Sequence, residues 1–116
     1  MRFPRGFRLT RGADLRMVAR EGKRIRTQHL EIRTAASLLP HPRVGFIVPK
    51  YGQSSVARNR LKRRLREIVR QELLPKLPGG DIVVRARREA YDAPFVVLHE
   101  QLTRSTERVA NLLTGR

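Results

Sequence analysis

Cysteine is absent from the 116-residue chain, which excludes disulfide bonds and thiolate metal sites. Such a composition fits a reducing compartment, and we expect a cytoplasmic protein. No apolar run approaches the roughly 20 residues that a membrane-spanning helix needs. The N-terminus is charged and has no apolar signal core, so the sequence predicts neither membrane insertion nor secretion.

Aromatic and acidic residues are scarce. Aromatic residues make up 5% of the chain and tryptophan is absent, so a platform of many stacked bases is not the main mode of binding. Ten acidic residues face 26 Lys and Arg, which gives a net charge of +16. Such a charge attracts polyanions, and nucleic acid is the leading partner class. An anionic membrane surface is the alternative, but the basic helix described below lacks the aromatic anchors of an interfacial helix.

The arrangements that catalysis or metal binding requires are also missing. The histidines lie in separate predicted elements, without metal-ligand spacing to another histidine or an acid; they are His29, His41 and His99. His99 and Glu100 are either an acid–base pair or a solvated pair on a helix surface. We therefore expect no catalysis by the chain's own side chains, and no metal or cofactor bound by them.

What the chain has is a strongly basic helical segment. Seven of the thirteen residues from Arg58 to Arg70 are Lys or Arg. Apolar residues recur in the segment at the spacing of one helix face: Val56, Leu61, Leu65, Ile68, Val69 and Leu73. A basic stripe steps by four through Arg58, Lys62, Arg66 and Arg70.

Like charges at this spacing repel by roughly 0.2–0.5 kcal/mol per pair. The basic stripe is therefore either a solvated face or a surface on which a polyanion offsets the repulsion. We favour the polyanion, because only Glu67 opposes these charges and solvated faces usually mix both signs.

The remaining periodicity predicts the order helix, strand, strand, basic helix, strand, helix. These elements cover residues 11–21, 23–33, 43–48, 56–74, 81–86 and 95–113. Ser54 or Ser55 is the expected N-cap of the basic helix, and Asp92 that of the last helix, with Pro94 in its first turn. The order predicts a small α+β fold, or α/β sandwich, with helices packed on one sheet. The basic helix is long enough to be a crossover between parallel strands.

We expect a single RNA-binding domain over residues 1–116, which begins with a basic, extended arm at residues 1–10. Phe3 and Phe7 in this arm either stack on bases or pack against the core, and we favour the core. Within the basic helix, arginine can pair with phosphate through two parallel hydrogen bonds. Asn59 both donates and accepts, so it either reads a base edge or a 2′-hydroxyl, or serves as a surface or capping residue.

Arg58-Asn59-Arg60, followed by Leu61 to Glu67, closely resembles the signature of the bacterial ribonuclease P protein component. Three further blocks resemble the family, in the same order and at the family's spacing. They are the N-terminal segment with Arg8-Leu9 and Gly22-Lys23-Arg24, the strand 43–50 before the signature, and the strand 81–87 after it.

The resemblance implies a fold similar to the second domain of ribosomal protein S5, with a left-handed crossover through the basic helix. Such a crossover is an exception to the usual right-handed rule. It also implies that the protein binds a catalytic RNA, one protein to one RNA subunit. The holoenzyme removes the 5′ leader of precursor tRNA, and the RNA carries the active site and its Mg²⁺ ions.

Residue roles follow from the same resemblance. Contacts with the catalytic RNA are expected from Arg58, Asn59, Arg60, Lys62, Arg63, Arg64 and Arg66. Contacts with the leader or its flanks are expected from Leu15, Lys50, Tyr51, Arg85 and Arg87.

The sequence departs from the family in two places. Family members usually carry aromatic residues at the positions of Leu15 and Ala19, so only apolar contact by Leu15 is expected here. Lys50 is followed by Tyr51 rather than by a second lysine, so Tyr51 offers a stacking surface in place of a charge.

Two other functions are compatible with the charge and the predicted fold. One is a structural RNA-binding protein, such as a ribosomal protein. The other is a nuclease that acts alone without a metal, and the missing acid–base arrangement argues against it.

Overall fold

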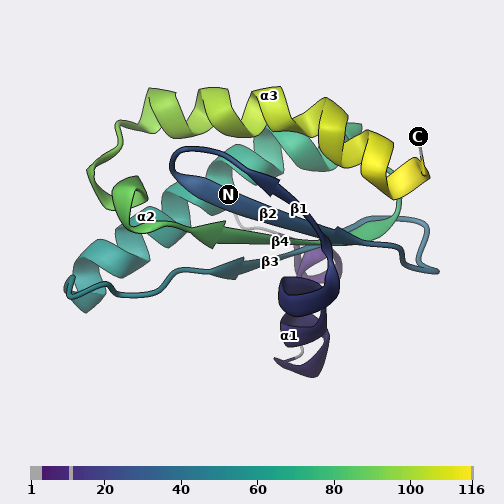
Figure 1. Cartoon of the computed structure of the whole chain (residues 1–116), viewed down its shortest axis with the longest axis horizontal. Coiled ribbons are helices and arrows are strands. Elements are labelled where there is room, and N and C mark those ends of the chain that lie inside the picture. The colour runs from purple at the N-terminus through teal and green to yellow at the C-terminus, as the bar shows by residue number, and fades with distance from the viewer. Residues whose placement is uncertain (1–3, 11, 116) are drawn as a thin grey trace.

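The computed structural model describes residues 4–10 and 12–115. Its four-stranded sheet has the strand order β1-β2-β4-β3, with α1 on one face and α2 and α3 on the other (Figure 1). The strands are β1 (Lys23–Arg26), β2 (Leu30–Ala35), β3 (Pro42–Ile47) and β4 (Gly80–Ala86). The helices are α1 (Gly12–Glu21), α2 (Ser55–Ile68) and α3 (Phe95–Thr114). Within the described residues, no helix is long and apolar enough to cross a bilayer.

The predicted strand 23–33 is wrong in one respect, because it is a hairpin of β1 and β2. Thr27 closes the turn: its backbone N–H donates to the carbonyl of Leu30 at 2.8 Å, and its hydroxyl accepts from the Leu30 N–H at 3.0 Å. The sequence contains a signal for this turn. Ile25 and Ile32 differ in parity, so one strand would place them on opposite faces, whereas the hairpin pairs them directly and buries both.

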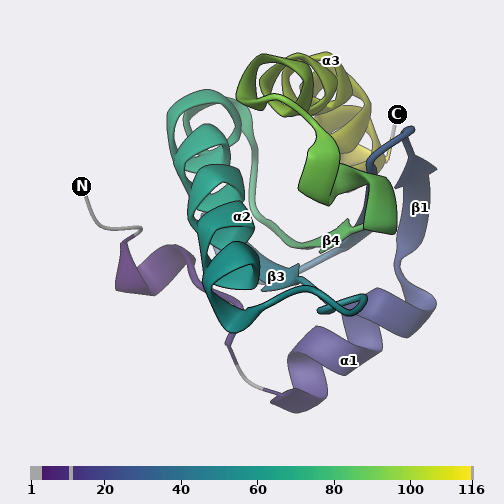
Figure 2. The same ribbon diagram turned by 90° about the vertical axis from the view of Figure 1, so that its left-hand side faces the viewer.

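The predicted parallel crossover is confirmed. Strands β3 and β4 pair in parallel, and α2 connects them. In Figure 2 both strands point toward the viewer, α2 lies above the sheet and β4 lies to the right of β3. This arrangement makes the crossover left-handed, the hand that the resemblance implies and that is rare among proteins.

The main core lies between the sheet and the two helices α2 and α3. The apolar face of the basic helix is buried as predicted at Leu61, Leu65, Ile68, Val69 and Leu73, the last two of which lie in the turn that follows α2. Val56 is an error in that prediction, since 68% of its surface is exposed. It lies in the first turn of α2, before the helix reaches the core cluster, which begins at Leu61.

The basic helix changes its winding before it ends. After α2, a π-helical turn covers Val69–Leu73 and a 3-10 turn covers Leu74–Lys76. The wider turn keeps both Val69 and Leu73 fully buried. The segment therefore reaches the length expected of one helix, although Pro75 lies inside its last turn rather than beyond it.

The last helix differs from the prediction at its start. Asp92 ends a 3-10 turn, Arg88–Asp92, and does not cap the helix. The N-cap is Pro94, which has an extended backbone and no side-chain cap. The polar middle of α3 is helical as well. Ser105 and Thr106 are buried there, and their hydroxyls are satisfied by donating to the carbonyls of Gln101 and Leu102, at 2.8 and 3.1 Å.

A smaller cluster joins α1 to the opposite face of the sheet, with Leu9, Val18 and Val83 at its centre. The N-terminal segment is not extended throughout. It forms a 3-10 turn at Arg5–Phe7 and then runs beside β3, where the Leu9 N–H donates to the Val44 carbonyl at 3.0 Å.

The core interpretation of Phe7 is confirmed. Its ring packs against the main core and lies 5.1 Å from the ring of His41. Phe3 and Arg11 lie outside the described residues.

Candidate nucleic-acid interface

Helix α2 begins where the sequence predicts. Ser54 is the N-cap, and its hydroxyl accepts from the backbone N–H of Ala57 at 3.1 Å. With the start fixed and the apolar face buried, the intervening polar positions are turned away from the core. We call these polar positions the signature residues: Arg58, Asn59, Arg60, Lys62, Arg63, Arg64 and Arg66.

None of the signature residues is buried. Asn59, Arg60, Arg63 and Arg66 are exposed, whereas Arg58, Lys62 and Arg64 are half-buried. Asn59, Arg60 and Arg63 line a shallow hollow with Val56. The signature residues thus place six cationic side chains on the part of α2 that is turned away from the core. Arg70 does not extend it as an unpaired charge, because Glu67 holds its guanidinium at 2.6 Å.

Arg58 has a structural contact that the sequence does not reveal. Its Nε donates to the carbonyl of Val48 at 2.8 Å, and the hydroxyl of Tyr91 donates to the next carbonyl, that of Pro49, at 2.6 Å. Burial raises the pKa of Tyr91, and the nearby Arg58 partly opposes this, so the phenol remains a donor at neutral pH. Arg58 thus ties the residues that follow β3 to the start of α2, and Tyr91 ties them to the turn before α3.

Lys62 and Arg66 lie beside a second hollow, between α2 and the outer strand β3. Its walls include Arg8, Leu9, Thr10, Val44, Gly45, Phe46, Lys62 and Arg66. Burial lowers the pKa of Lys62, and the charges of Arg66 and Arg58 lower it further. No carboxylate of the described residues pairs with Lys62. An anion in this hollow would relieve the repulsion.

Sulfate should therefore raise the melting temperature of the protein more than chloride does at equal ionic strength. An anion at about 100 times its Kd stabilises the native state by about 2.7 kcal/mol. Lys62→Met should abolish most of this gain, whereas Lys50→Met, which removes a lysine outside the hollow, should keep it. Scanning calorimetry measures both. Equal gains in sulfate and chloride would contradict the proposed anion contact.

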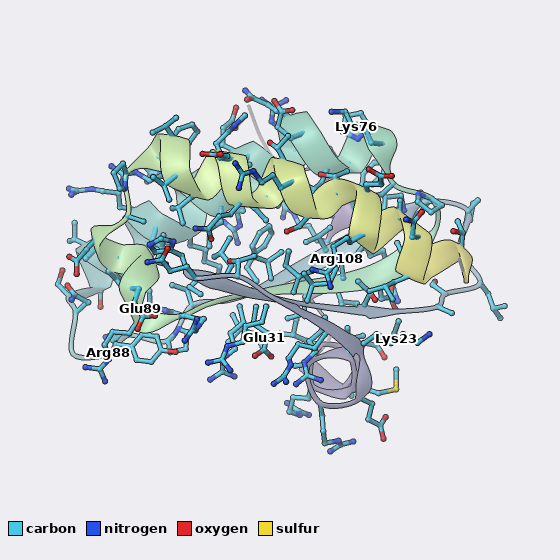
Figure 3. All side chains as sticks on the ribbon, turned by 45° about the horizontal axis from the view of Figure 1, so that its top comes forward. Lys23, Glu31, Lys76, Arg88, Glu89 and Arg108 are labelled. Atoms are coloured by element: carbon cyan, nitrogen blue, oxygen red, sulfur yellow. The ribbon has the colours of Figure 1, made fainter. Side chains whose placement is uncertain are left out.

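Three of the residues predicted near the leader gather where β3 and β4 end. Lys50 and Tyr51 follow β3, and Arg87 follows β4. The hydroxyl of Tyr51 donates to the carbonyl of Ala86 at 3.3 Å, which ties the two strand ends together. The guanidinium of Arg88, at the same end of the sheet in Figure 3, lies 5.4 Å from the centre of the Tyr51 ring.

Tyr51 has an unusual backbone, with a φ of 49°. A left-handed conformation costs a residue with a side chain about 1–3 kcal/mol. Three contacts of the side chain stabilise this strained conformation. They are the hydrogen bond to Ala86, the Arg88 guanidinium over the ring, and the edge-on contact with Tyr91, whose ring centre lies 6.4 Å away. The ring is thus held in place before any ligand arrives.

Arg85 and Arg87 differ in their surroundings. Arg85 is exposed and pairs in register with Glu31 and Ile47, so it lies on the face that carries α1, where Figure 3 shows Glu31. Arg87 instead donates to the carbonyls of Thr27 and Gln28, both at 3.0 Å. Arg87 therefore braces the β1–β2 turn.

Leu15 is half-buried and forms part of the seam between α1 and β3. It packs with the smaller cluster and lies against Gly45, where an added Cβ would approach Leu15 Cδ1 to 2.3 Å. Leu15 thus helps to position α1 on the sheet, and its contact with the leader stays a prediction.

No group of three or more His, Asp or Glu side chains converges as a metal site among residues 4–10 and 12–115. His99 lies 3.2 Å from Glu72 and is not paired with Glu100, whose carboxylate holds Arg104. The site offers cations, amides and two aromatic rings, and this chemistry suits phosphate and base binding.

Comparison with known proteins agrees with this geometry. The family model for Ribonuclease P matches residues 3–110. The ribonuclease P protein component of Streptomyces griseus is 34% identical over 93% of this chain and 92% of that protein. That of Syntrophobacter fumaroxidans is 46% identical, but the match covers only 64% of this chain and 63% of that protein.

Solved structures show the same fold. The RNase P protein from Thermotoga maritima has a TM-score of 0.78 at 27% identity, over 87% of this chain and 98% of that one. The Staphylococcus aureus RNase P protein has a TM-score of 0.80 at 24% identity, over 92% and 97%. The chain belongs to the ribonuclease P protein family.

Proposed function

We propose that this chain is the protein subunit of a bacterial ribonuclease P, which binds the catalytic RNA and the 5′ leader of precursor tRNA. The observation that carries the proposal is the set of signature residues on α2, six of which are Lys or Arg and none of which is buried. A surface of this kind neutralises phosphates, and its affinity falls steeply with salt.

Two parts of the molecule bind different RNAs. The signature residues on α2 contact the catalytic RNA, and the end of the sheet with Lys50, Tyr51 and Arg85 contacts the leader. Arg87 contributes by bracing the hairpin next to this end. Helix α1 packs on the sheet face that also carries Arg85 and so borders the leader contacts.

The chain supplies binding and orientation, and the holoenzyme is an endoribonuclease whose chemistry belongs to the RNA. Mg²⁺ ions held by that RNA would supply the metal chemistry of phosphodiester hydrolysis. One protein binds one RNA subunit, and the complex works in the cytoplasm.

The proposal is tested by mixing the protein with a bacterial ribonuclease P RNA and precursor tRNA at low Mg²⁺. The rate of leader removal should rise with protein and level off at one protein per RNA, and the product should carry the mature 5′ end. The protein without the RNA should cleave nothing.

Two outcomes would favour other functions. Tight binding to the RNA without any gain in cleavage would indicate a structural RNA-binding protein. Cleavage by the protein alone would indicate a nuclease that acts by itself.

A further inference from the structure

A third hollow lies on the flank of α2 that faces the segment before α3. It is lined by Gln53, Ala57, Arg60, Leu61, Arg64 and Tyr91. Tyr91 reaches it from the 3-10 turn Arg88–Asp92, which is distant in sequence from α2. The tyrosine is half-buried and forms part of the wall.

The wall that Tyr91 forms is rigid. Its hydroxyl is held by the Pro49 carbonyl at 2.6 Å, and the Tyr51 ring meets it nearly at right angles, with an interplanar angle of 86°. An aromatic ring fixed in this way loses little conformational freedom when a second ring stacks on it.

The remaining lining residues supply complementary chemistry. Ala57 and Leu61 provide an apolar floor, and Gln53 provides an amide that donates and accepts. Arg60 and Arg64 provide two guanidinium groups, and no acidic side chain of the described residues pairs with either. Within the part of the chain that the structure describes, no carboxylate lines the hollow.

An aromatic wall, an apolar floor, one amide and two guanidinium groups match the parts of a single nucleotide. Stacking on an aromatic side chain contributes about 1–3 kcal/mol per base, and arginine pairs with phosphate in bidentate fashion. A base inside a duplex cannot stack on a protein ring, so the occupant needs an unpaired base.

We infer that this hollow binds one unpaired RNA nucleotide, with its base stacked on Tyr91 and its phosphate held by Arg60 and Arg64. The inference rests on the proposed function, because the nucleotide belongs to the RNA that the signature residues contact. It adds a site for base stacking to a surface whose other expected contacts are charges and the amide of Asn59.

The test uses the full-length protein with adenosine 5′-monophosphate, and ribose 5-phosphate as the matched probe without a base. The chain has only two tyrosines, so ¹³C-labelled tyrosine gives two sets of ring signals in an NMR spectrum, and Tyr51→Phe assigns them. Adenosine 5′-monophosphate should shift the Tyr91 signals and bind about tenfold more tightly than ribose 5-phosphate, the lower part of the range that stacking gives.

Two variants separate the base contact from the phosphate contact. Tyr91→Leu should reduce the affinity for adenosine 5′-monophosphate to that for ribose 5-phosphate, whereas Arg64→Gln should weaken both. Tyr91→Phe keeps the ring without the hydrogen bond to Pro49, so it should still bind the base and shows whether weaker binding in Tyr91→Leu comes from the ring.

Equal affinities for the two probes, with the Tyr91 signals unmoved, would overturn the inference. So would an unchanged affinity for adenosine 5′-monophosphate in folded Tyr91→Leu protein. Either result leaves the proposed function standing, because binding of the whole RNA and leader removal are measured separately.

Discussion

Replacing Arg60 and Arg63 together with glutamine should weaken binding of ribonuclease P RNA by about 30- to 150-fold, because each lost contact costs about 1–1.5 kcal/mol and every 1.4 kcal/mol is about tenfold in affinity. The slope of log affinity against log salt should fall by about two, one for each phosphate that the variant no longer neutralises. Both side chains are exposed on α2, so the free energy of unfolding should change by less than about 0.5 kcal/mol for each substitution.

The matched control is the double variant Lys76→Gln and Arg108→Gln, which removes the same charge. Both residues are exposed and lie outside the signature residues (Figure 3). Filter binding at several salt concentrations, using both double variants and the unchanged protein, measures affinity and slope. If the two variants weaken binding equally, net charge rather than the α2 surface governs binding.

Gly45→Ala should destabilise the protein by about 1–3 kcal/mol, the usual range for overpacking. A Cβ at this position would approach Leu15 Cδ1 to 2.3 Å and the carbonyl oxygen of Leu9 to 2.7 Å. Leu15 can rotate away, but the Leu9 carbonyl belongs to backbone that runs beside β3. Relief of the contact therefore requires the N-terminal segment and α1 to move away from the sheet.

The displacement should have a functional signature, because α1 borders the face that carries Arg85. The preference of the holoenzyme for precursor tRNA over mature tRNA should fall, while binding of the catalytic RNA through α2 should persist. Gly6→Ala is the control, since a Cβ there meets nothing within 4 Å. Thermal unfolding and competition binding measure the two effects, and an unchanged melting temperature would show that the seam tolerates the methyl group.

Local patterns in the sequence are sufficient to predict the position of α2 and its buried face. The apolar spacing identifies the buried face from Leu61 to Leu73, and cap chemistry narrows the N-cap to Ser54 or Ser55, of which the structure uses Ser54. The β1–β2 turn can also be predicted from the sequence. Ile25 and Leu30 are both apolar but would point to opposite faces of a single continuous strand, and a turn between them places both in the core.

Contacts between distant segments could not be predicted in the same way. Tyr91 lies in a short stretch without periodicity, and its importance depends on a carbonyl 42 residues earlier. The second role of Arg58, as a donor to the Val48 carbonyl, cannot be predicted either, because the sequence does not distinguish Arg58 from the neighbouring arginines. The handedness of the crossover came only from the resemblance, since no local pattern encodes it.

The two carbonyls at the end of β3 have a consequence for assembly. Val48 is tied to Arg58 of α2, and Pro49 to Tyr91 of the turn before α3, while the strained Tyr51 follows two residues later. Within the proposed function, an RNA phosphate that drew the Arg58 guanidinium away would leave the Val48 carbonyl without this donor, three residues before the strained Tyr51. Contacts of the large RNA with Arg58 and of the leader with Tyr51 would therefore act on the same short stretch of backbone after β3.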